Sequence, residues 1–180
     1  NKCSLNLDRS IKILDDVMKI VNKHNMADQV LLKSDPSDAS LKMVETFAPK
    51  VDYMPIFMEE DVASEKIENM NINYIGAELV FKSESSSIAQ DSYIDMMHKK
   101  GRILWGNSIV YSSRVPLAAG HNDDISLTGD PEDGWGWLAK TGFDIIQNLH
   151  RLVKRGRFHQ HLLETTFQCL VFLNILAVFI

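Results

Sequence analysis

The sequence predicts an α/β protein built around a parallel sheet. Short apolar segments alternate with amphipathic ones through residues 4–147, the apolar segments end in polar residues, and the connections are short. No glycine-rich phosphate fingerprint follows a predicted strand, which argues against a dinucleotide-binding sheet. We therefore expect a partial (β/α)8 barrel that contributes six strands, and keep the doubly wound sheet as the alternative.

Each predicted element rests on its own pattern. The first helix places apolar residues at helical spacing, the second follows a Ser-Asp-Pro start signature at residues 34–36, and Gly101 and Gly142 end two others. Strands are predicted at residues 4–8, 29–33, 51–57, 73–81, 102–107 and 143–147. Helices are predicted at residues 10–24, 39–47, 59–69, 85–100 and 130–141, with a long polar loop before the last.

The end of the chain departs from this pattern. Residues 148–180 are first basic and then, from Phe167 to Ile180, almost wholly apolar. The apolar run is shorter than the roughly 20 residues that span a bilayer. We expect residues 1–147 to form the partial barrel, and residues 148–180 to be a tail foreign to the fold, a buried final helix or a non-native segment rather than a membrane anchor.

The net charge and the cysteine content bear on the class of partner and on the compartment. The net charge of −5 argues against nucleic acid, whose binding depends on neutralising phosphates, but it is compatible with a divalent cation. Cys3 and Cys169 form no disulfide framework and do not reveal the compartment. The chain opens close to a predicted strand, so we expect a preceding part of the barrel upstream.

In a barrel, the carboxyl ends of the strands and the loops after them line one mouth. Carboxylates there suit a hard divalent cation, a lysine suits a phosphate oxygen, and an aromatic wall suits a small polar ligand. The residues at these positions are Asn6, Asp8, Lys33, Met54, Pro55, Glu78, Trp105, Asn107 and His121–Asp124.

Several of these residues also have a structural interpretation. Asp8 is as well placed to cap the following helix as to bind a metal, and Lys33 alone is better explained by a side chain that reaches from the strand end to solvent. Trp105 fits a core aromatic, and His121 fits a solvated or structural histidine. Glu78 is the most informative, because an unpaired carboxylate inside an apolar strand would be costly.

Six segments of the chain form a distinctive series: LNLDRS (5–10), DQVLLKS (28–34), VDYMPIF (51–57), GAELVF (76–81), RILWGNS (102–108) and AGHNDDISLTGDPEDGWGWLAKTGFDIIQ (119–147). The last is the most specific, because it combines a Gly-His-x-Asp-Asp loop with a Gly-Trp helix. In order and spacing these segments resemble the later strands of the glycerophosphodiester phosphodiesterase family.

The resemblance implies about strands 3 to 8 of a TIM barrel of the phosphatidylinositol-phosphodiesterase type. It also implies a lipid-metabolism hydrolase that releases an alcohol and glycerol 3-phosphate, using Ca²⁺ or Mg²⁺ and a histidine acid–base pair. Asp8 would ligate the metal, Lys33 would meet phosphate charge, and Glu78, Trp105, Asn107 and His121 would line the substrate site. The family resemblance also favours an extracellular or periplasmic protein.

The family's His-Arg-Gly, Glu-x-Asp and His-Asp segments do not occur in this sequence, and Thr-Asp-x-Pro does not follow Gln147. We therefore expect no catalytic residue in this chain and little or no activity. Two alternatives stay open: a phosphatidylinositol-type phospholipase that forms a cyclic phosphate, and a non-catalytic protein that binds a phosphate ligand or is only structural.

Overall fold

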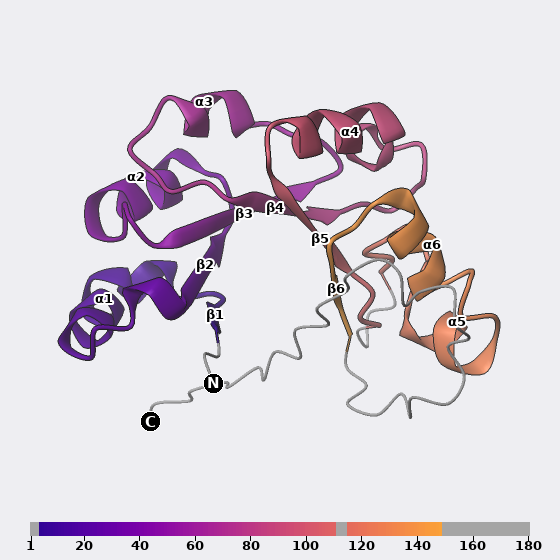
Figure 1. Cartoon of the computed structure of the whole chain (residues 1–180), viewed down its shortest axis with the longest axis horizontal. Helices are drawn as coiled ribbons and strands as arrows, with labels where there is room; N and C mark the ends of the chain where they lie inside the picture. The colour runs from indigo at the N-terminus through magenta and orange to yellow at the C-terminus, as the bar shows by residue number, and fades with distance from the viewer. Residues whose placement is uncertain (1–3, 111–114, 149–180) are drawn as a thin grey trace. The chain divides into compact units, whose positions relative to one another are not determined.

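The chain is an α/β protein with an all-parallel sheet in the part that the structure describes. The computed structural model describes residues 4–110 and 115–148. Within them six parallel strands pair in their order along the chain, from β1 to β6 (Figure 1). The predicted class and the parallel sheet are confirmed. The expected tail lies outside the described residues from position 149 onward.

Helices or turns connect the strands. The strands are β1 (Leu5–Leu7), β2 (Val30–Ser34), β3 (Asp52–Met58), β4 (Gly76–Val80), β5 (Ile103–Asn107) and β6 (Ile145–Gln147). The helices are α1 (Leu14–Lys23), α2 (Asp38–Phe47), α3 (Ser64–Glu68), α4 (Asp91–Lys99), α5 (Asp123–Thr128) and α6 (Trp135–Thr141). Short 3₁₀ turns occur at Ile11–Ile13, Ala27–Gln29 and Ser87–Ala89.

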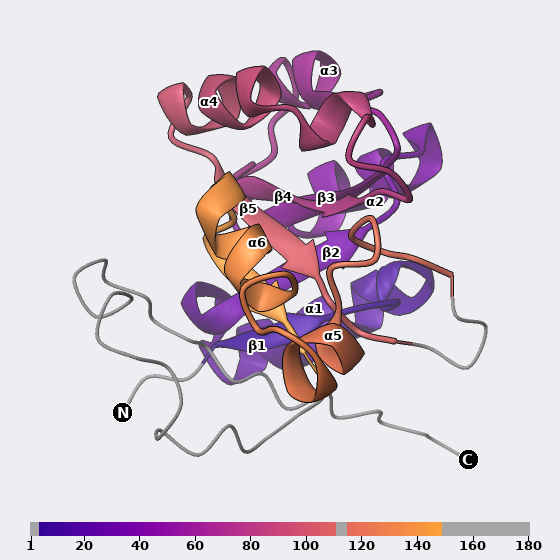
Figure 2. The ribbon, with the colours of Figure 1, turned by 90° about the vertical axis from the view of Figure 1, so that its right-hand side faces the viewer.

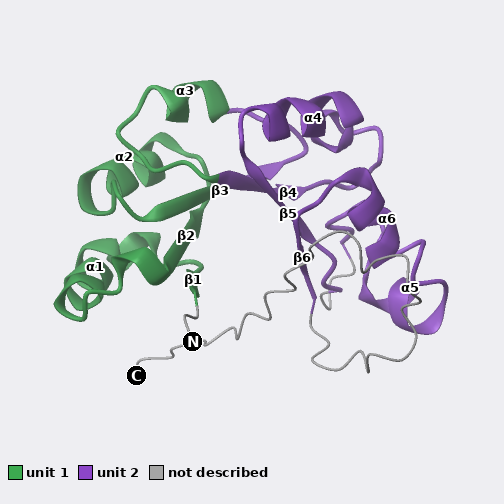
Figure 3. Cartoon of the chain, in the orientation of Figure 1, with its two compact units in different colours: residues 1–55, 63–75, 171–180 green, residues 56–62, 76–170 purple. Residues whose placement is uncertain are grey.

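The chain divides into two compact units, which Figure 3 colours separately. The described part of unit 1 comprises residues 4–55 and 63–75, and that of unit 2 comprises residues 56–62, 76–110 and 115–148. The division falls inside β3, after Pro55.

Unit 1 has its core between β2 and two amphipathic helices. Helix α1 buries Leu14, Met18 and Val21, which share one helical face, and its other face is mostly polar, although Ile20 is exposed there. The Ser37 hydroxyl accepts a hydrogen bond from the Ser40 N–H and caps α2. All five residues of β2 are buried, as expected for a strand of a parallel sheet that is covered on both faces.

Unit 2 places α6 beside β5 and β6, as Figures 1 and 2 show from two sides. Helix α4 ends at Gly101, which has a φ of 69°, and the Arg102 N–H donates to the Met97 carbonyl, so the end is a Schellman motif. Gly142, with a φ of 110°, ends α6 in a left-handed conformation. Both glycines act as the stops that the sequence predicts.

The six predicted strands are confirmed, but three predictions between them are wrong. The helix predicted at residues 59–69 is reduced to α3, and the one predicted at residues 130–141 begins only at Trp135. Asp130 accepts a hydrogen bond from the Glu132 N–H, so the acidic run forms a turn before the helix. The polar loop after β5 contains α5, which the sequence analysis missed because it is short and polar.

Replacing Tyr53 with phenylalanine should make the free energy of unfolding fall less steeply as the pH rises above about 10. Burial, opposed by a 3.0 Å hydrogen bond with the Ser34 hydroxyl and helped by the Asp35 charge, raises the pKa of Tyr53 to about 12. The neutral Tyr53 phenol therefore contributes fully to the free energy of unfolding below about pH 10, the pKa of tyrosine in the unfolded chain. This contribution, roughly 3 kcal/mol, is lost as the pH rises from about 10 through about 12.

Urea unfolding from pH 8 to 12 measures this, and tyrosinate absorbance identifies the group. At pH 8 the variant should be less stable by about 1 kcal/mol, because the hydrogen bond with Ser34 is lost. Its stability should then fall less steeply than that of the unmodified chain. Parallel curves would contradict the assignment.

Candidate binding site

Lys33 is the most unusual candidate residue of unit 1. It lies near the carboxyl end of β2, and its side chain is 1% exposed, among the largest fully buried side chains of the described part. The interpretation that Lys33 reaches solvent is therefore wrong. A lysine is seldom buried without compensation for its charge, so this position marks a polar environment at the strand end.

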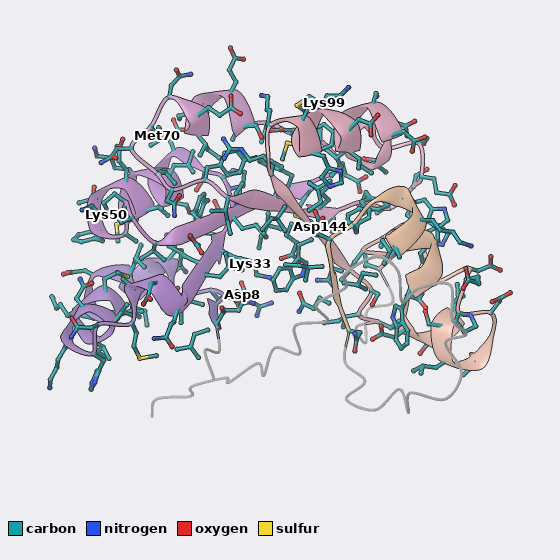
Figure 4. The ribbon with its side chains drawn as sticks, viewed as in Figure 1. Asp8, Lys33, Lys50, Met70, Lys99 and Asp144 are labelled. Atoms are coloured by element: carbon teal, nitrogen blue, oxygen red, sulfur yellow. The ribbon has the colours of Figure 1, made fainter. Side chains whose placement is uncertain are left out.

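Asp8 lies at the end of the neighbouring strand. Leu7 of β1 is in register with Leu32 of β2, so the residues that follow them, Asp8 and Lys33, come next in the same register. Figure 4 labels both residues at neighbouring strand ends. Asp8 is exposed. The 3₁₀ turn that follows has Ser10 at its cap position and no side-chain cap, so the capping interpretation of Asp8 is not confirmed.

Asn6 adds a second oxygen near Asp8. Its partner across the ladder is Leu31, which shares a face of β2 with Lys33 because side chains alternate along a strand. The Oδ1 atom of Asn6 is buried and has no hydrogen-bond partner among the described residues. An orphaned acceptor of this kind is uncommon in folded proteins and calls for a donor or a cation.

In unit 2, Glu78 and Asn107 form a buried pair. Glu78 is 4% exposed and Asn107 is 6% exposed. The Nδ2 of Asn107 donates to Glu78 Oε1 at 3.0 Å, and its Oδ1 accepts from the Ile109 N–H at 3.1 Å. The amide is therefore held from both ends, and it fixes the carboxylate at the carboxyl edge of β4 and β5.

Trp105 extends this face of unit 2 toward β6. It is in register with Glu78 on one side and with Ile145 on the other, and it is 1% exposed. Its indole Nε1 donates to Gln147 Oε1 at 3.1 Å. Glu78, Trp105, Asn107 and Gln147 thus make one row of polar and aromatic groups, and Gln147 is a member that the sequence analysis did not propose.

His121 contacts a different set of residues. Its ring stacks on Trp137 with centroids 3.9 Å apart and an interplanar angle of 3°. Nε2 lies 2.9 Å from Glu84 Oε1, and Nδ1 lies within hydrogen-bond distance of the Asp133 carbonyl. These contacts join the loop after β5 to the segment after β4 and to α6, so they support the structural interpretation of His121.

The sequence analysis also did not predict a buried cluster formed by Ser108, which follows β5, and by Asp123 and Trp135 at the starts of α5 and α6. Asp123 is 2% exposed; its Oδ1 accepts from the Ser108 hydroxyl at 2.6 Å and from the Trp135 indole at 2.9 Å. The Ser126 hydroxyl accepts from the Trp135 N–H at 2.9 Å. The local signal was Asn122, a cap residue followed by two acidic residues, which is typical of a helix start.

Neither a complete metal site nor a membrane span occurs in the described part. No group of three or more histidine, cysteine, aspartate or glutamate side chains within residues 4–110 and 115–148 could hold a metal ion. Over the same residues, none of the helices has the length and apolar character needed to cross a bilayer. Asp8 and Asn6 are two oxygen donors close together in sequence at β1.

Residues 53–151 match DUF4996, a domain of unknown function. The match covers more than half of the chain. The chain belongs to this family. The DUF4996 region includes Glu78, Trp105, Asn107 and His121, and it begins after Asp8 and Lys33. No curated protein matches the sequence.

Proposed function

We propose that this DUF4996 chain is part of a phosphoric diester hydrolase that acts on glycerophosphodiesters. We further propose that these 180 residues bind the ligand without hydrolysing it. The observation that carries the proposal is the buried Lys33 at the carboxyl end of a parallel strand, where α/β proteins place their ligand-binding groups. The resemblance of six segments to the glycerophosphodiester phosphodiesterase family supplies the substrate class.

The described residues suit binding better than acid–base catalysis. Hydrolysis in the resembling family uses two histidines across the phosphodiester. Of the described histidines, His24 ends α1, His98 pairs with Asp144 at 3.2 Å, and His121 is held by Glu84 and Trp137. A pair poised for proton transfer is therefore not found among residues 4–110 and 115–148.

A divalent cation fits only in part. The orphaned Oδ1 of Asn6 and the carboxylate of Asp8 are both oxygen donors of the kind that Ca²⁺ and Mg²⁺ prefer. These two groups fall short of the six or more ligands of a hard cation, so the remaining ones would be phosphate oxygens, water or other residues. Bound there, the cation would neutralise phosphate charge.

In unit 2, considered by itself, Glu78 is the residue proposed to contact the ligand. Its carboxylate, oriented by Asn107, accepts hydrogen bonds from ligand hydroxyls, while Trp105, which is 1% exposed, packs beside it in the core. A glycerol moiety offers hydroxyl groups and an apolar backbone of this kind. The alternative is a protein that binds a phosphate ligand, or is only structural, without belonging to a hydrolase.

Lys33→Met should weaken glycerophosphocholine binding and leave the fold intact. Methionine keeps the length of the side chain and removes the charge, so the loss should be about ten- to a hundred-fold in affinity, the value of a charge-assisted hydrogen bond. Lys50→Met is the matched control, because Lys50 is exposed (Figure 4). Isothermal titration with added Ca²⁺ measures affinity, and circular dichroism checks folding.

Glycerol 3-phosphate release by the same chain should not rise above the blank. Clear turnover would contradict the absence of a catalytic pair. Equal affinity of Lys33→Met, Lys50→Met and the unmodified chain would contradict the role of Lys33. Appearance of a cyclic phosphate would favour the phospholipase alternative.

A further inference from the structure

Unit 2 contains a hollow that the proposed phosphodiester site does not use. It has a volume of about 360 Å³, within the range of small-molecule sites. It lies between the segment after β4, the start of α4 and one side of α6. The lining residues are Glu84, Ala89, Gln90, Asp91, Ser92, Trp137 and Thr141.

Hydrogen bonds and ring stacking hold several of the lining residues in place. The Gln90 side-chain amide donates to the carbonyls of Glu84 at 2.6 Å and Ser86 at 3.1 Å, which fixes the segment after β4. His121 stacks on Trp137 and binds Glu84, so both of these lining residues are held in place. On the far side, Gly142 after α6 lies against Ile94 of α4. A preformed hollow loses little entropy when a ligand binds.

The charges around the hollow oppose an anion, because Glu84 and Asp91 place two carboxylates in the lining. Glu84 already contacts His121, which leaves Asp91 as the acceptor for a ligand. The start of α4 presents N–H groups without acceptors inside the helix, which a simple cation could not use. A neutral ligand that both donates and accepts hydrogen bonds can use the carboxylate and these N–H groups together.

We propose that this hollow binds a neutral, hydroxyl-rich ring, such as a pyranose sugar. The Asp91 carboxylate accepts from sugar hydroxyls, and the Ser92 and Thr141 hydroxyls bind as donors or acceptors. The Trp137 ring stacks on His121 and contributes the aromatic part of a lining that is otherwise mainly polar, so ligand hydroxyls would make most of the contacts. The inference goes beyond the proposed function and does not depend on it.

The three tryptophans provide an internal test by ¹H–¹⁵N NMR. Trp105 and Trp135 have indole N–H groups that donate to Gln147 and to the Ser108–Asp123 cluster, whereas Trp137 lines the hollow. On titration with neutral methyl glucoside, galactoside and mannoside, the Trp137 indole signal should shift and saturate for at least one sugar. The other two indole signals should stay in place.

Asp91→Asn tests the contact directly. It removes a charged acceptor from the lining and should weaken sugar binding about ten-fold. Asp95→Asn is the matched control, because it makes the same change one turn later on the exposed side of α4. Ser92→Ala should weaken binding by a smaller factor.

Three results would overturn the proposal. The first is a Trp137 signal that does not shift with any of these pyranosides. The second is equal affinity of Asp91→Asn and Asp95→Asn. The third is saturation of the Trp137 signal by tetramethylammonium or inorganic phosphate but not by a pyranoside.

Discussion

Replacing Asp123 with alanine is expected to lower the free energy of unfolding by about 2 to 3 kcal/mol. The change removes the buried carboxylate that accepts hydrogen bonds from both the Ser108 hydroxyl and the Trp135 indole N–H. The Ser108 hydroxyl keeps the Gln147 carbonyl at 2.8 Å and the Trp135 indole keeps the Ser108 oxygen at 3.1 Å, so two strong hydrogen bonds are lost but neither donor is left without an acceptor. Urea denaturation followed by tryptophan fluorescence measures the loss.

Asp124→Ala is the matched control for this prediction. Asp124 follows Asp123 in the first turn of α5, so both variants lose the same favourable charge at the start of the helix. Asp124 is exposed, and its replacement should cost less than about 1 kcal/mol. If the two variants unfold at the same urea concentration, the cluster does not stabilise the protein.

Gly76→Ala should prevent β4 and β5 from pairing at their present spacing. A Cβ atom on Gly76 would lie 2.0 Å from the carbonyl oxygen of Ile103, its partner across the ladder. The obstacle is backbone, which cannot move aside without breaking the ladder. We expect a loss of more than about 3 kcal/mol, or failure to fold.

Gly106→Ala provides the comparison, because its Cβ would meet the side chains of Phe143 and Leu138 at 3.0 and 3.2 Å. These side chains can shift, so this variant should lose about 1 to 3 kcal/mol and remain folded. Thermal unfolding of both variants tests the difference. A Gly76→Ala chain as stable as Gly106→Ala would show that the strands can separate without cost.

The sequence predicts the strands better than the segments between them. Continuous apolar runs such as those of β2 and β4 stand out because parallel strands are buried on both faces, and Gly101 and Gly142 mark helix ends by their left-handed backbone. Helix α5 has only six residues and starts with two polar ones, so its periodicity is too short to detect.

The sequence predicts which residues belong to the candidate site, but not their burial or their hydrogen-bond partners. Glu78 was singled out because an apolar strand makes its charge costly, and the structure supplies Asn107 as a partner. The burial of Lys33 could not be foreseen, because it depends on how elements distant in sequence cover β2. The same holds for His121, whose contacts with Glu84 and Trp137 come from two other elements.

The order of the strands has a consequence for how the chain acquires its structure. Each strand pairs with the next one to be synthesised, and the paired residues are separated by 21 positions between Leu31 and Asp52 and by 40 between Trp105 and Ile145. Loop closure costs more as the separation grows. Folding can therefore proceed from the ribosome one strand at a time, with the docking of β6 on β5 as the slowest step.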